Sequence, residues 1–473
     1  MKQPPAPVPL VVDMDGTLLR TDTLLESLFA AARAKPLWLL QRLLSLPWAM
    51  ARLKQDLTGV AALDAKTLPI YQPLVDYLRE QKRLGRILIL ATGSDYGIAM
   101  AVANRCALFD KVLASDGTLN LSGESKKDRL VSAYGIKGFD YIGNSSGDLP
   151  VWASARQGWA VNPSVYLRSE IRRMPHVQRF NSDARIDLAS YISAIRVSHW
   201  MKNLLLLVPL LLDHKQYDST TLFNVFLALA CFCLAASGVY LLNDLLDLGT
   251  DRQHPHKRRR ALASGALPIQ RALVLLAGFW WASWCIAMFL PSAFRVCLFI
   301  YLLLMLVYTL YLKNIPFVDA ATLAVGYCLR ITAGALAAGA LVSSWLLTCS
   351  GLMFFGLALL KRYAEMVTLR DLMGVNTPVR GYSMDRASSV AGVGISACCV
   401  ACGLFAYFPL AIAAGEGRLA TWMVGALSLL WVAHMWMMAY RGRIQDDPVS
   451  FALHDPASRV LGLLTLTASL ADI

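Results

Sequence analysis

The residues with the clearest capacity for chemistry lie in segment 243–260, between two apolar runs of helical length. Asn243, Asp247 and Asp251 recur every four residues, so a helix would carry one amide and two carboxylates on a single face. Oxygen ligands of this kind suit Mg²⁺. A basic run at residues 257–260 follows, and cations beside metal-binding carboxylates favour phosphate groups. The segment therefore predicts a diphosphate site at a membrane surface.

The composition describes the surroundings of this segment. The chain has 473 residues, of which 56% are hydrophobic and 16% charged, and its mean hydropathy is +0.48. These values exclude an ordinary soluble protein and predict several membrane spans. Residues 1–185 mix charged and apolar side chains, whereas the remainder is a succession of apolar runs. We predict a globular domain at 1–185, a membrane domain at 186–473, and no nucleic-acid partner.

The membrane half contains about nine apolar runs of spanning length, which predict an all-α bundle. They lie near residues 190–212, 221–243, 270–289, 293–312, 317–340, 343–362, 388–410, 419–440 and 457–472. Lys and Arg concentrate after the second, fourth, sixth and eighth runs, in loops that the positive-inside rule assigns to the cytoplasm. No signal peptide precedes the first domain, which is therefore also expected in the cytosol. Both arguments predict a multi-pass protein of the inner (cytoplasmic) membrane.

Strand-like runs in the first domain end at polar residues. They are 8–12 before Asp13, 86–91 before Thr92, and 139–143 before Asn144. Helical patterns separate these runs, which indicates a parallel α/β sheet. Such sheets bind ligands at the carboxyl ends of their strands. We therefore expect these polar residues to meet at one edge.

Four motifs occur in order in this domain. Asp-Met-Asp-Gly-Thr stands at 13–17, Thr-Gly-Ser at 92–94, Lys126 follows, and Gly-Asn-Ser-Ser-Gly-Asp stands at 143–148. Together they resemble the motifs of the haloacid dehalogenase superfamily, over essentially the whole domain. The resemblance implies a Rossmann-like α/β fold with a helical cap, here at about residues 24–75, and a phosphatase activity.

The same resemblance implies roles for individual side chains. Asp13 is expected to be the nucleophile that forms an aspartyl-phosphate, and Asp15 the general acid and base. Thr92 and Lys126 are expected to hold phosphate oxygens. Asp13 and Asp148 are expected to bind Mg²⁺.

Asn144 departs from the superfamily pattern, because many members carry a second aspartate at this place. Altered metal affinity is one expected consequence. A degenerate domain kept as a scaffold is the alternative to an active phosphatase.

An insertion at residues 24–63 separates the first two motifs and resembles a helical cap over the phosphatase site. Its stretch 36–50 is rich in leucine and tryptophan, but Arg42 and Pro47 interrupt it, which argues against a membrane span. Two interpretations remain open for the apolar residues. They pack the cap's own core, or they lie on the membrane interface.

The membrane domain opens with a motif of its own. Segment 243–260 is followed by Ala-Ser-Gly at 263–265, and together they resemble the UbiA superfamily of intramembrane transferases, over roughly residues 190–473. Those proteins are nine-helix bundles that bind a diphosphate donor through Mg²⁺. The resemblance implies these Mg²⁺ ligands: Asn243, Asp244, Asp247 and Asp251. It also implies that Lys257 and Arg260 bind phosphate.

The segment after the sixth apolar run differs in composition from the corresponding segment of many members of that superfamily. Many aromatic prenyltransferases carry a second aspartate-rich motif there, whereas segment 361–383 holds two acidic residues among four cations. Glu365 is a candidate metal ligand, and Lys361 and Arg362 are candidate phosphate ligands. An allylic diphosphate has one charged group, but phosphoribosyl pyrophosphate carries a 5-phosphate as well, which extra cations suit.

The pieces Lys-Arg-Tyr-Ala-Glu at 361–365 and Arg-Val-Ser-His-Trp-Met-Lys-Asn at 196–203 resemble the decaprenyl-phosphate phosphoribosyltransferase branch of the superfamily. This implies phosphoribosyl transfer to a polyprenyl phosphate, with Asp247 and Asp251 as the catalytic pair. Lys202, Asn203 and Arg330 complete the expected substrate site. Arg330 lies in an apolar run, where a charge is either functional or part of a buried structural pair.

Two alternatives remain for the membrane domain. A UbiA-type aromatic or quinone prenyltransferase would share the aspartate motif but use an allylic donor. A membrane transporter with a regulatory domain would also place charges within spans, but it does not predict the aspartates or the Ala-Ser-Gly that follows. Fusion to a phosphatase favours phosphoribosyl transfer over both alternatives, because a phosphatase is suited to remove the 5-phosphate of the lipid product.

Overall fold

The structure is a computed structural model. It describes residues 8–45, 50–180, 188–212, 217–341, 343–373, 381–412, 418–444 and 448–470. The chain forms two compact units, which are Met1–Val197 with Tyr240–Gly278, and Ser198–Val239 with Phe279–Ile473. The predicted domain boundary at residues 185 and 186 lies outside the described residues.

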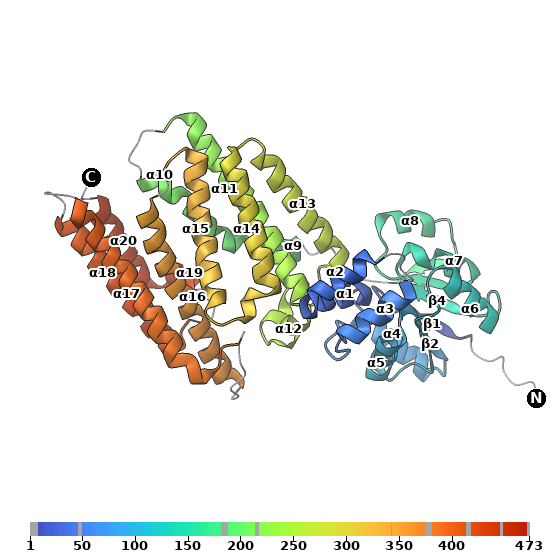
Figure 1. The fold of residues 1–473 in the computed structure, drawn as a ribbon. Coiled ribbons are helices and arrows are strands. Elements are labelled where there is room, and N and C mark those ends of the chain that lie inside the picture. Colours follow the sequence, from blue (N-terminus) through green and yellow to red (C-terminus); the bar gives the residue numbers. More distant parts are fainter. Residues whose placement is uncertain are drawn as a thin grey trace, which may run out of the picture. The chain divides into compact units, whose positions relative to one another are not determined.

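A six-stranded parallel sheet forms the centre of the first domain, in the order β3-β2-β1-β4-β5-β6 (Figure 1). The strands are β1 Leu10–Val12, β2 Leu88–Asp95, β3 Lys111–Ser115, β4 Asp140–Gly143, β5 Gly158–Ala160 and β6 Val177–Arg179. In β1, Val12 pairs with Leu90 of β2 and with Ile142 of β4. The residues that follow these three positions therefore reach the same edge. The predicted parallel α/β sheet is confirmed.

Helices cover both faces of this sheet. Successive residues of a strand point to opposite sides, so a strand made of apolar residues has an apolar side chain to bury on each face. Leu10 and Val12 belong to one buried cluster and Val11 to the other. The helices packed on the two faces are α4 Gln72–Arg83, α5 Tyr96–Cys106, α6 Glu124–Tyr134, α7 Leu149–Ser154 and α8 Val165–Ile171. The first two contribute to the cluster of Leu10, and the other three to the cluster of Val11.

The predicted cap is helical and consists of α1 Thr23–Ala34, α2 Pro36–Leu44 and α3 Met50–Val60. Ala31, Leu39, Leu53 and Leu57 pack together as its small core. The packing interpretation therefore holds for part of the insertion. Leu37, Leu40 and Leu44 lie on the outer side of α2 and stay exposed, and residues 46–49 lie outside the described part of the chain.

The elements of regular secondary structure assigned in the described residues of the membrane half are all helices. Seven helices there are long and apolar enough to cross a membrane. They are α11 Ser219–Leu246, α13 Ile269–Ala287, α14 Ser292–Leu310, α15 Val318–Ala338, α16 Ser344–Met373, α17 Ala387–Ile412 and α18 Arg418–Tyr440. Two further short helices, α12 Leu248–Gln253 and α19 Pro448–His454, join them.

The predicted count of nine spans is not confirmed. The predicted run 190–212 is divided into α9 Leu188–Ile195, a 3-10 helix at Val197–Leu207 and α10 Val208–Leu212. Arg196 stands between the first two with a positive φ of 56°, a conformation that an α-helix does not contain. The last predicted run forms α20 Pro456–Leu470, which has 15 residues.

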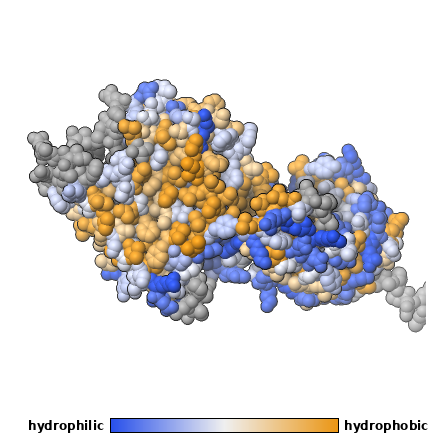
Figure 2. All heavy atoms as spheres, viewed as in Figure 1, coloured by the Kyte–Doolittle hydropathy of each residue, from blue (hydrophilic) through white to orange (hydrophobic). Residues whose placement is uncertain are grey.

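The surface of the long helices is apolar. On the face shown in Figure 2, hydrophobic residues gather over these helices, whereas the first domain shows many hydrophilic ones. Phe226 of α11, Trp281 of α13 and Phe299 of α14 are 65%, 70% and 58% exposed. Large apolar side chains facing outward in such numbers fit a lipid environment, since lipid tails take the place of water. The chain is a multi-pass membrane protein.

Candidate active sites

Three predicted residues of the first domain meet at the carboxyl edge of its sheet. Asp13 follows β1, and its Oδ1 accepts a hydrogen bond of 2.7 Å from Nζ of Lys126, which extends from α6. The Lys126 ammonium also lies 3.6 Å from Asp148 and donates to the Tyr141 hydroxyl at 3.1 Å. Tyr141 in turn donates to Asp148 at 2.6 Å. A buried lysine thus joins two buried carboxylates.

Backbone and hydroxyl donors of the fourth motif fix Asp148. The amides of Asn144 and Ser145 and the Ser145 hydroxyl each donate to its Oδ2 at 3.0 Å. The Asn144 side chain packs on Gly16, where φ is +70° and a Cβ would lie 2.0 Å from Nδ2. The two neighbouring motif loops therefore touch, and this contact requires glycine at position 16.

Asp15 lies in a network with the second motif and the start of α1. The amide and hydroxyl of Thr23 donate to its carboxylate at 3.1 and 3.0 Å, and the Ser94 hydroxyl donates to it as well. Thr92 is buried and accepts a hydrogen bond from the Ser94 amide at 3.1 Å. Ser94 stood in the predicted motif without an assigned role. Its contact with Asp15 shows that it positions this carboxyl group.

Burial sets the acidity of both aspartates. It raises the pKa of Asp13 to about 6, although Lys126 acts in the opposite direction. It raises the pKa of Asp15 to about 7, and the nearby Asp22 adds to the increase. A carboxyl group with a pKa near neutrality both donates and accepts protons readily, which suits a general acid and base.

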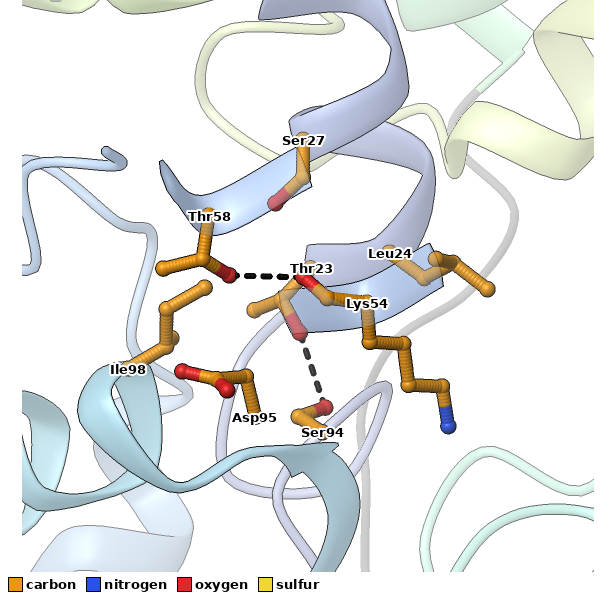
Figure 3. A pocket seen from close by; sticks show the side chains of 8 residues that line it. All are labelled: Thr23, Leu24, Ser27, Lys54, Thr58, Ser94, Asp95 and Ile98. Atoms are coloured by element: carbon orange, nitrogen blue, oxygen red, sulfur yellow. Dashed lines mark hydrogen bonds between the residues drawn. The ribbon is translucent and has the colours of Figure 1, made fainter. Parts of the chain in front are cut away.

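A small cavity opens between the cap and the sheet. Figure 3 shows α1, α3 and the end of β2 around it, with Thr23, Ser94 and Lys54 among the lining residues. The Lys54 ammonium donates to the carbonyl of Gly93 and to Oδ1 of Asn120. Burial lowers the pKa of Lys54, and the charge of Asp15 opposes this. Sequence reasoning missed Lys54, because it lies in the cap outside every motif.

The motif of segment 243–260 has the predicted helical spacing. The Asp247 amide donates to the Asn243 carbonyl at 2.9 Å, and the Asp251 amide donates to the Asp247 carbonyl at 2.8 Å. Asp247 caps α12, and Asn243 and Asp244 stand in the last turn of α11. The carboxylates of Asp244, Asp247 and Asp251 are buried. Their side chains therefore leave one short stretch of backbone close together.

Arginines pair with each of these buried carboxylates. Arg260 contacts Asp251 at 2.6 Å and Asp244 at 3.2 Å. Arg196 also pairs with Asp244. The predicted Arg260 thus lies among the aspartates, whereas Lys257 is half-buried at the start of the 3-10 helix Lys257–Arg259.

Two arginines of this site had no assigned role in the sequence. Arg196 is the first residue of segment 196–203, which resembles the decaprenyl-phosphate phosphoribosyltransferase branch, and it contacts Asp244. Arg33 comes from α1 of the first domain and pairs with Asp247 at 2.8 Å. Burial raises the pKa of Asp251, and Arg260 opposes this. These cations compensate the charge of the carboxylates.

The donor chemistry of both sites fits Mg²⁺, since carboxylate and amide oxygens are its preferred protein ligands. Among the described residues, however, no group of three His, Cys, Asp or Glu side chains lies in an arrangement that could hold a metal ion. Lys126 contacts Asp13, and Arg260 contacts Asp251, where a metal would bind.

The second unit holds the remaining predicted residues. Arg330 in α15 is buried and donates to Oδ1 of Asn203 at 2.9 Å, to the Tyr301 hydroxyl at 2.9 Å and to the Gly326 carbonyl at 2.7 Å. Its guanidinium also lies over the ring of Tyr301. The predicted Arg330 and Asn203 are therefore brought together. Lys202 is half-buried next to Asn203 in the 3-10 helix.

Arg362 is held inside the second unit by acidic partners. It pairs with Asp319 of α15 and with Glu365 at 2.7 Å, and it donates to the Tyr308 hydroxyl at 3.3 Å. Tyr382 donates to the other oxygen of Asp319. Asp319 is buried and was missed, because a single aspartate near the start of an apolar helix carries no motif. Lys361 is half-buried one residue before Arg362.

Comparison with known proteins agrees with the motif of the membrane domain. The model of the UbiA prenyltransferase family matches residues 205–455. A decaprenyl-phosphate phosphoribosyltransferase of Mycobacterium tuberculosis is 30% identical over 288 residues, which are 59% of this chain and 91% of that protein. A HAD family hydrolase structure from Salmonella enterica aligns with 37% of this chain and 68% of its own, at 17% identity and a TM-score of 0.27.

One relative matches along both domains. The uncharacterized protein y4nM of Sinorhizobium fredii is 30% identical over 473 residues, which cover 98% of this chain and 90% of that protein. The family match extends over more than half of the chain and includes segment 243–260. The chain therefore belongs to the UbiA prenyltransferase family.

Proposed function

We propose that the membrane domain transfers the phosphoribosyl group of phosphoribosyl pyrophosphate to a polyprenyl phosphate, and that the first domain removes the 5-phosphate of the lipid product. The main support for this proposal is the sequence similarity to a decaprenyl-phosphate phosphoribosyltransferase, which is 30% identical to this chain over 91% of its own length. The cation-rich segment 361–383 supports the same donor. The enzyme is proposed to act in the inner membrane, with the first domain in the cytosol.

The transfer is a displacement at the anomeric carbon of the ribose. An oxygen of the polyprenyl phosphate forms a bond to the anomeric carbon. At the same time, the bond between this carbon and the diphosphate oxygen breaks. The nucleophile is already an anion, so it needs cations rather than a general base. Asn243, Asp244, Asp247 and Asp251 are proposed to hold Mg²⁺. Bound there, the metal supplies charge that stabilises the departing diphosphate.

Several cations of the chain are proposed to bind anionic groups of the substrates. Arg260 lies among the aspartates and is suited to bind diphosphate oxygens, and Lys257 follows the same motif. In the second unit, Lys202 and Lys361 are proposed to bind the 5-phosphate and the acceptor phosphate. Arg330 and Arg362 make several hydrogen bonds each inside the protein. We therefore propose that these two arginines act chiefly by positioning their neighbours.

The first domain is proposed to act as a phosphatase through Asp13. Its carboxylate attacks the phosphorus of the 5-phosphate, and the bond from phosphorus to the ribose O5 breaks. Asp15, whose pKa of about 7 keeps part of it protonated at neutral pH, donates a proton to that oxygen. Lys126 and Thr92 hold phosphate oxygens, and Asp148 with Asp13 is proposed to hold Mg²⁺. Water then hydrolyses the aspartyl-phosphate.

The test is an incubation of the purified full-length protein with labelled phosphoribosyl pyrophosphate, polyprenyl phosphate and Mg²⁺. Mass spectrometry of the lipid fraction is expected to find polyprenyl-phosphoryl ribose. Removal of Mg²⁺ by a chelator and the Asp247→Ala variant should both abolish labelling. Asp13→Asn should accumulate the 5-phosphorylated lipid. Absence of label from the lipid would reject the phosphoribosyl donor.

The printed name of the family favours a second candidate, transfer of a prenyl group from an allylic diphosphate to an aromatic or quinone acceptor. A competition assay separates the two. If the phosphoribosyl donor is correct, excess allylic diphosphate should inhibit labelling weakly and should yield no prenylated product.

A further inference from the structure

Helix α1 of the first domain reaches from the phosphatase site to the aspartate motif of segment 243–260. At its start, Thr23 donates to Asp15. Two turns of helix separate Glu26 from Arg33, so these side chains lie on the same side of α1. Glu26 binds Arg252 of α12, and Arg33 binds Asp247. One rigid helix therefore contributes residues to both candidate sites.

Glu26 and Arg252 form a buried, bidentate ion pair. Two nitrogens of Arg252 donate to the two oxygens of Glu26 at 2.7 and 2.6 Å, and its third nitrogen donates to the Ala263 carbonyl at 2.9 Å. The Thr21 hydroxyl also donates to Glu26. The Arg252 and Glu26 side chains are 4% and 3% exposed. This bidentate pair fixes α1 against α12 and so determines where Arg33 lies.

Arg33 is placed among the residues that are proposed to bind the diphosphate. Its Nη1 donates to Oδ1 of Asp247 and to the Thr250 hydroxyl, both at 2.8 Å. Its side chain remains 30% exposed, against 10% for that of Asp247. Unlike Arg252, which is buried and takes part in three bonds, Arg33 keeps part of its guanidinium accessible to a ligand. An arginine fork of this kind binds phosphate oxygens bidentately.

We propose that Arg33, supplied by the phosphatase domain, is a diphosphate-binding residue of the transferase site. It neutralises Asp247 before the donor arrives and then contacts the diphosphate when that carboxylate engages its metal ion. The proposal rests on the proposed function for the presence of a diphosphate donor, but not for the identity of the group transferred. It makes the first domain a part of the transferase site.

Binding of inorganic pyrophosphate with Mg²⁺ to the full-length protein tests this without turnover. By isothermal titration, Arg33→Gln is expected to weaken binding roughly tenfold, the effect of losing one charge-assisted hydrogen bond. Arg33→Lys keeps the charge but loses the planar fork, so its affinity should lie between that of Arg33→Gln and that of the wild type. The matched control is Arg42→Gln, since Arg42 lies in the same cap and pairs with Asp56 at 2.8 Å. It should bind pyrophosphate like the wild type.

Steady-state kinetics provide a second readout. Arg33→Gln should raise the KM for the diphosphate donor and change kcat much less, because the lost contact concerns donor binding. Unchanged pyrophosphate affinity in Arg33→Gln would overturn the proposal. Failure of the wild type to bind pyrophosphate would overturn it as well. Weaker binding in Arg33→Gln without phosphoribosyl label in the lipid would reject only the proposed donor.

Discussion

Lys126 lies between two carboxylates, 2.7 Å from Asp13 and 3.6 Å from Asp148. At the scale of single residues, this position gives it two tasks. It reduces the repulsion between the two buried anions, and it presents a cation to a phosphate group that approaches Asp13. A neutral side chain of similar length performs neither task.

Lys126→Met is therefore expected to lower the kcat of phosphate release about 10²- to 10³-fold, as removal of a positioned electrostatic donor does elsewhere. The measurement is the rate of phosphate release from a small phosphate monoester by the full-length protein. Lys127→Met is the matched control, because Lys127 is the next residue and pairs with Glu124 at the surface. Near-normal turnover in Lys126→Met would contradict the assigned role.

Lys54 offers a test of the cavity under the cap. It lines that cavity beside Ser94 and donates to Gly93 and Asn120. Because it approaches the site from the cap, we expect it to contact the leaving group of the substrate. Lys54→Met should raise the KM of the phosphatase roughly tenfold, with a smaller change in kcat. Arg52→Met, an exposed position on the same helix, should leave both constants unchanged. An equal KM in the two variants would place Lys54 outside substrate binding.

Residue types and spacing predicted the acidic members of both sites, together with Lys126 and Arg260, but not Arg33 and Arg196, which also pair with these carboxylates. Asp13, Asp247 and Asp251 belong to local motifs, and the spacing of the latter two reappears in the helical backbone. Arg33 and Asp247 are 214 positions apart in the chain. No local pattern relates such residues, because their contact exists only after the elements have packed.

At the scale of elements, strands were more predictable than the first membrane segment. The buried runs ending at Asp13, Thr92 and Asn144 became neighbouring parallel strands, since apolar runs of this length with a polar residue at the end carry their own signal. Residues 190–212 are also apolar, yet they form three pieces around Arg196. Hydropathy measures the cost of contact with water and does not register a backbone that leaves the helical region at one residue.

The contact between α1 and α12 depends on a buried ion pair, and removing one partner should be costly. Glu26→Ala leaves the Arg252 guanidinium buried without its carboxylate, which is expected to destabilise the protein by about 3–5 kcal/mol. The measurement is the thermal unfolding midpoint of the full-length protein in detergent. The double variant Glu26→Ala with Arg252→Ala should recover part of the loss, because the uncompensated charge disappears.

The matched comparison is the partly exposed pair Arg42 and Asp56 in the cap. Arg42→Ala is expected to cost less than about 1 kcal/mol, as is usual for a solvated ion pair. Equal shifts of the midpoint for Glu26→Ala and Arg42→Ala would show that burial of the first pair has no energetic consequence.

At the scale of the whole molecule, the fusion places two phosphate chemistries in one chain. The full-length similarity to y4nM shows that a second protein carries both parts. If the proposed order is correct, the product of the membrane domain is the substrate of the first domain. That product carries a long polyprenyl chain, and each buried CH₂ contributes about 0.8 kcal/mol to membrane binding. The intermediate therefore stays in the bilayer in which it is made.

Retention in the bilayer predicts how two inactive variants complement each other. Asp13→Asn should make the 5-phosphorylated lipid, and Asp247→Ala should be able only to dephosphorylate it. Reconstituted together in the same vesicles, they should yield polyprenyl-phosphoryl ribose, because the lipid diffuses between protein copies in one membrane. Reconstituted in separate vesicles that are then mixed, they should leave the 5-phosphorylated lipid unchanged. Mass spectrometry of the lipid distinguishes the two products. Full conversion in the mixed vesicles would mean that the intermediate leaves the membrane, and absence of conversion in shared vesicles would mean that the phosphatase acts only on lipid made by its own chain.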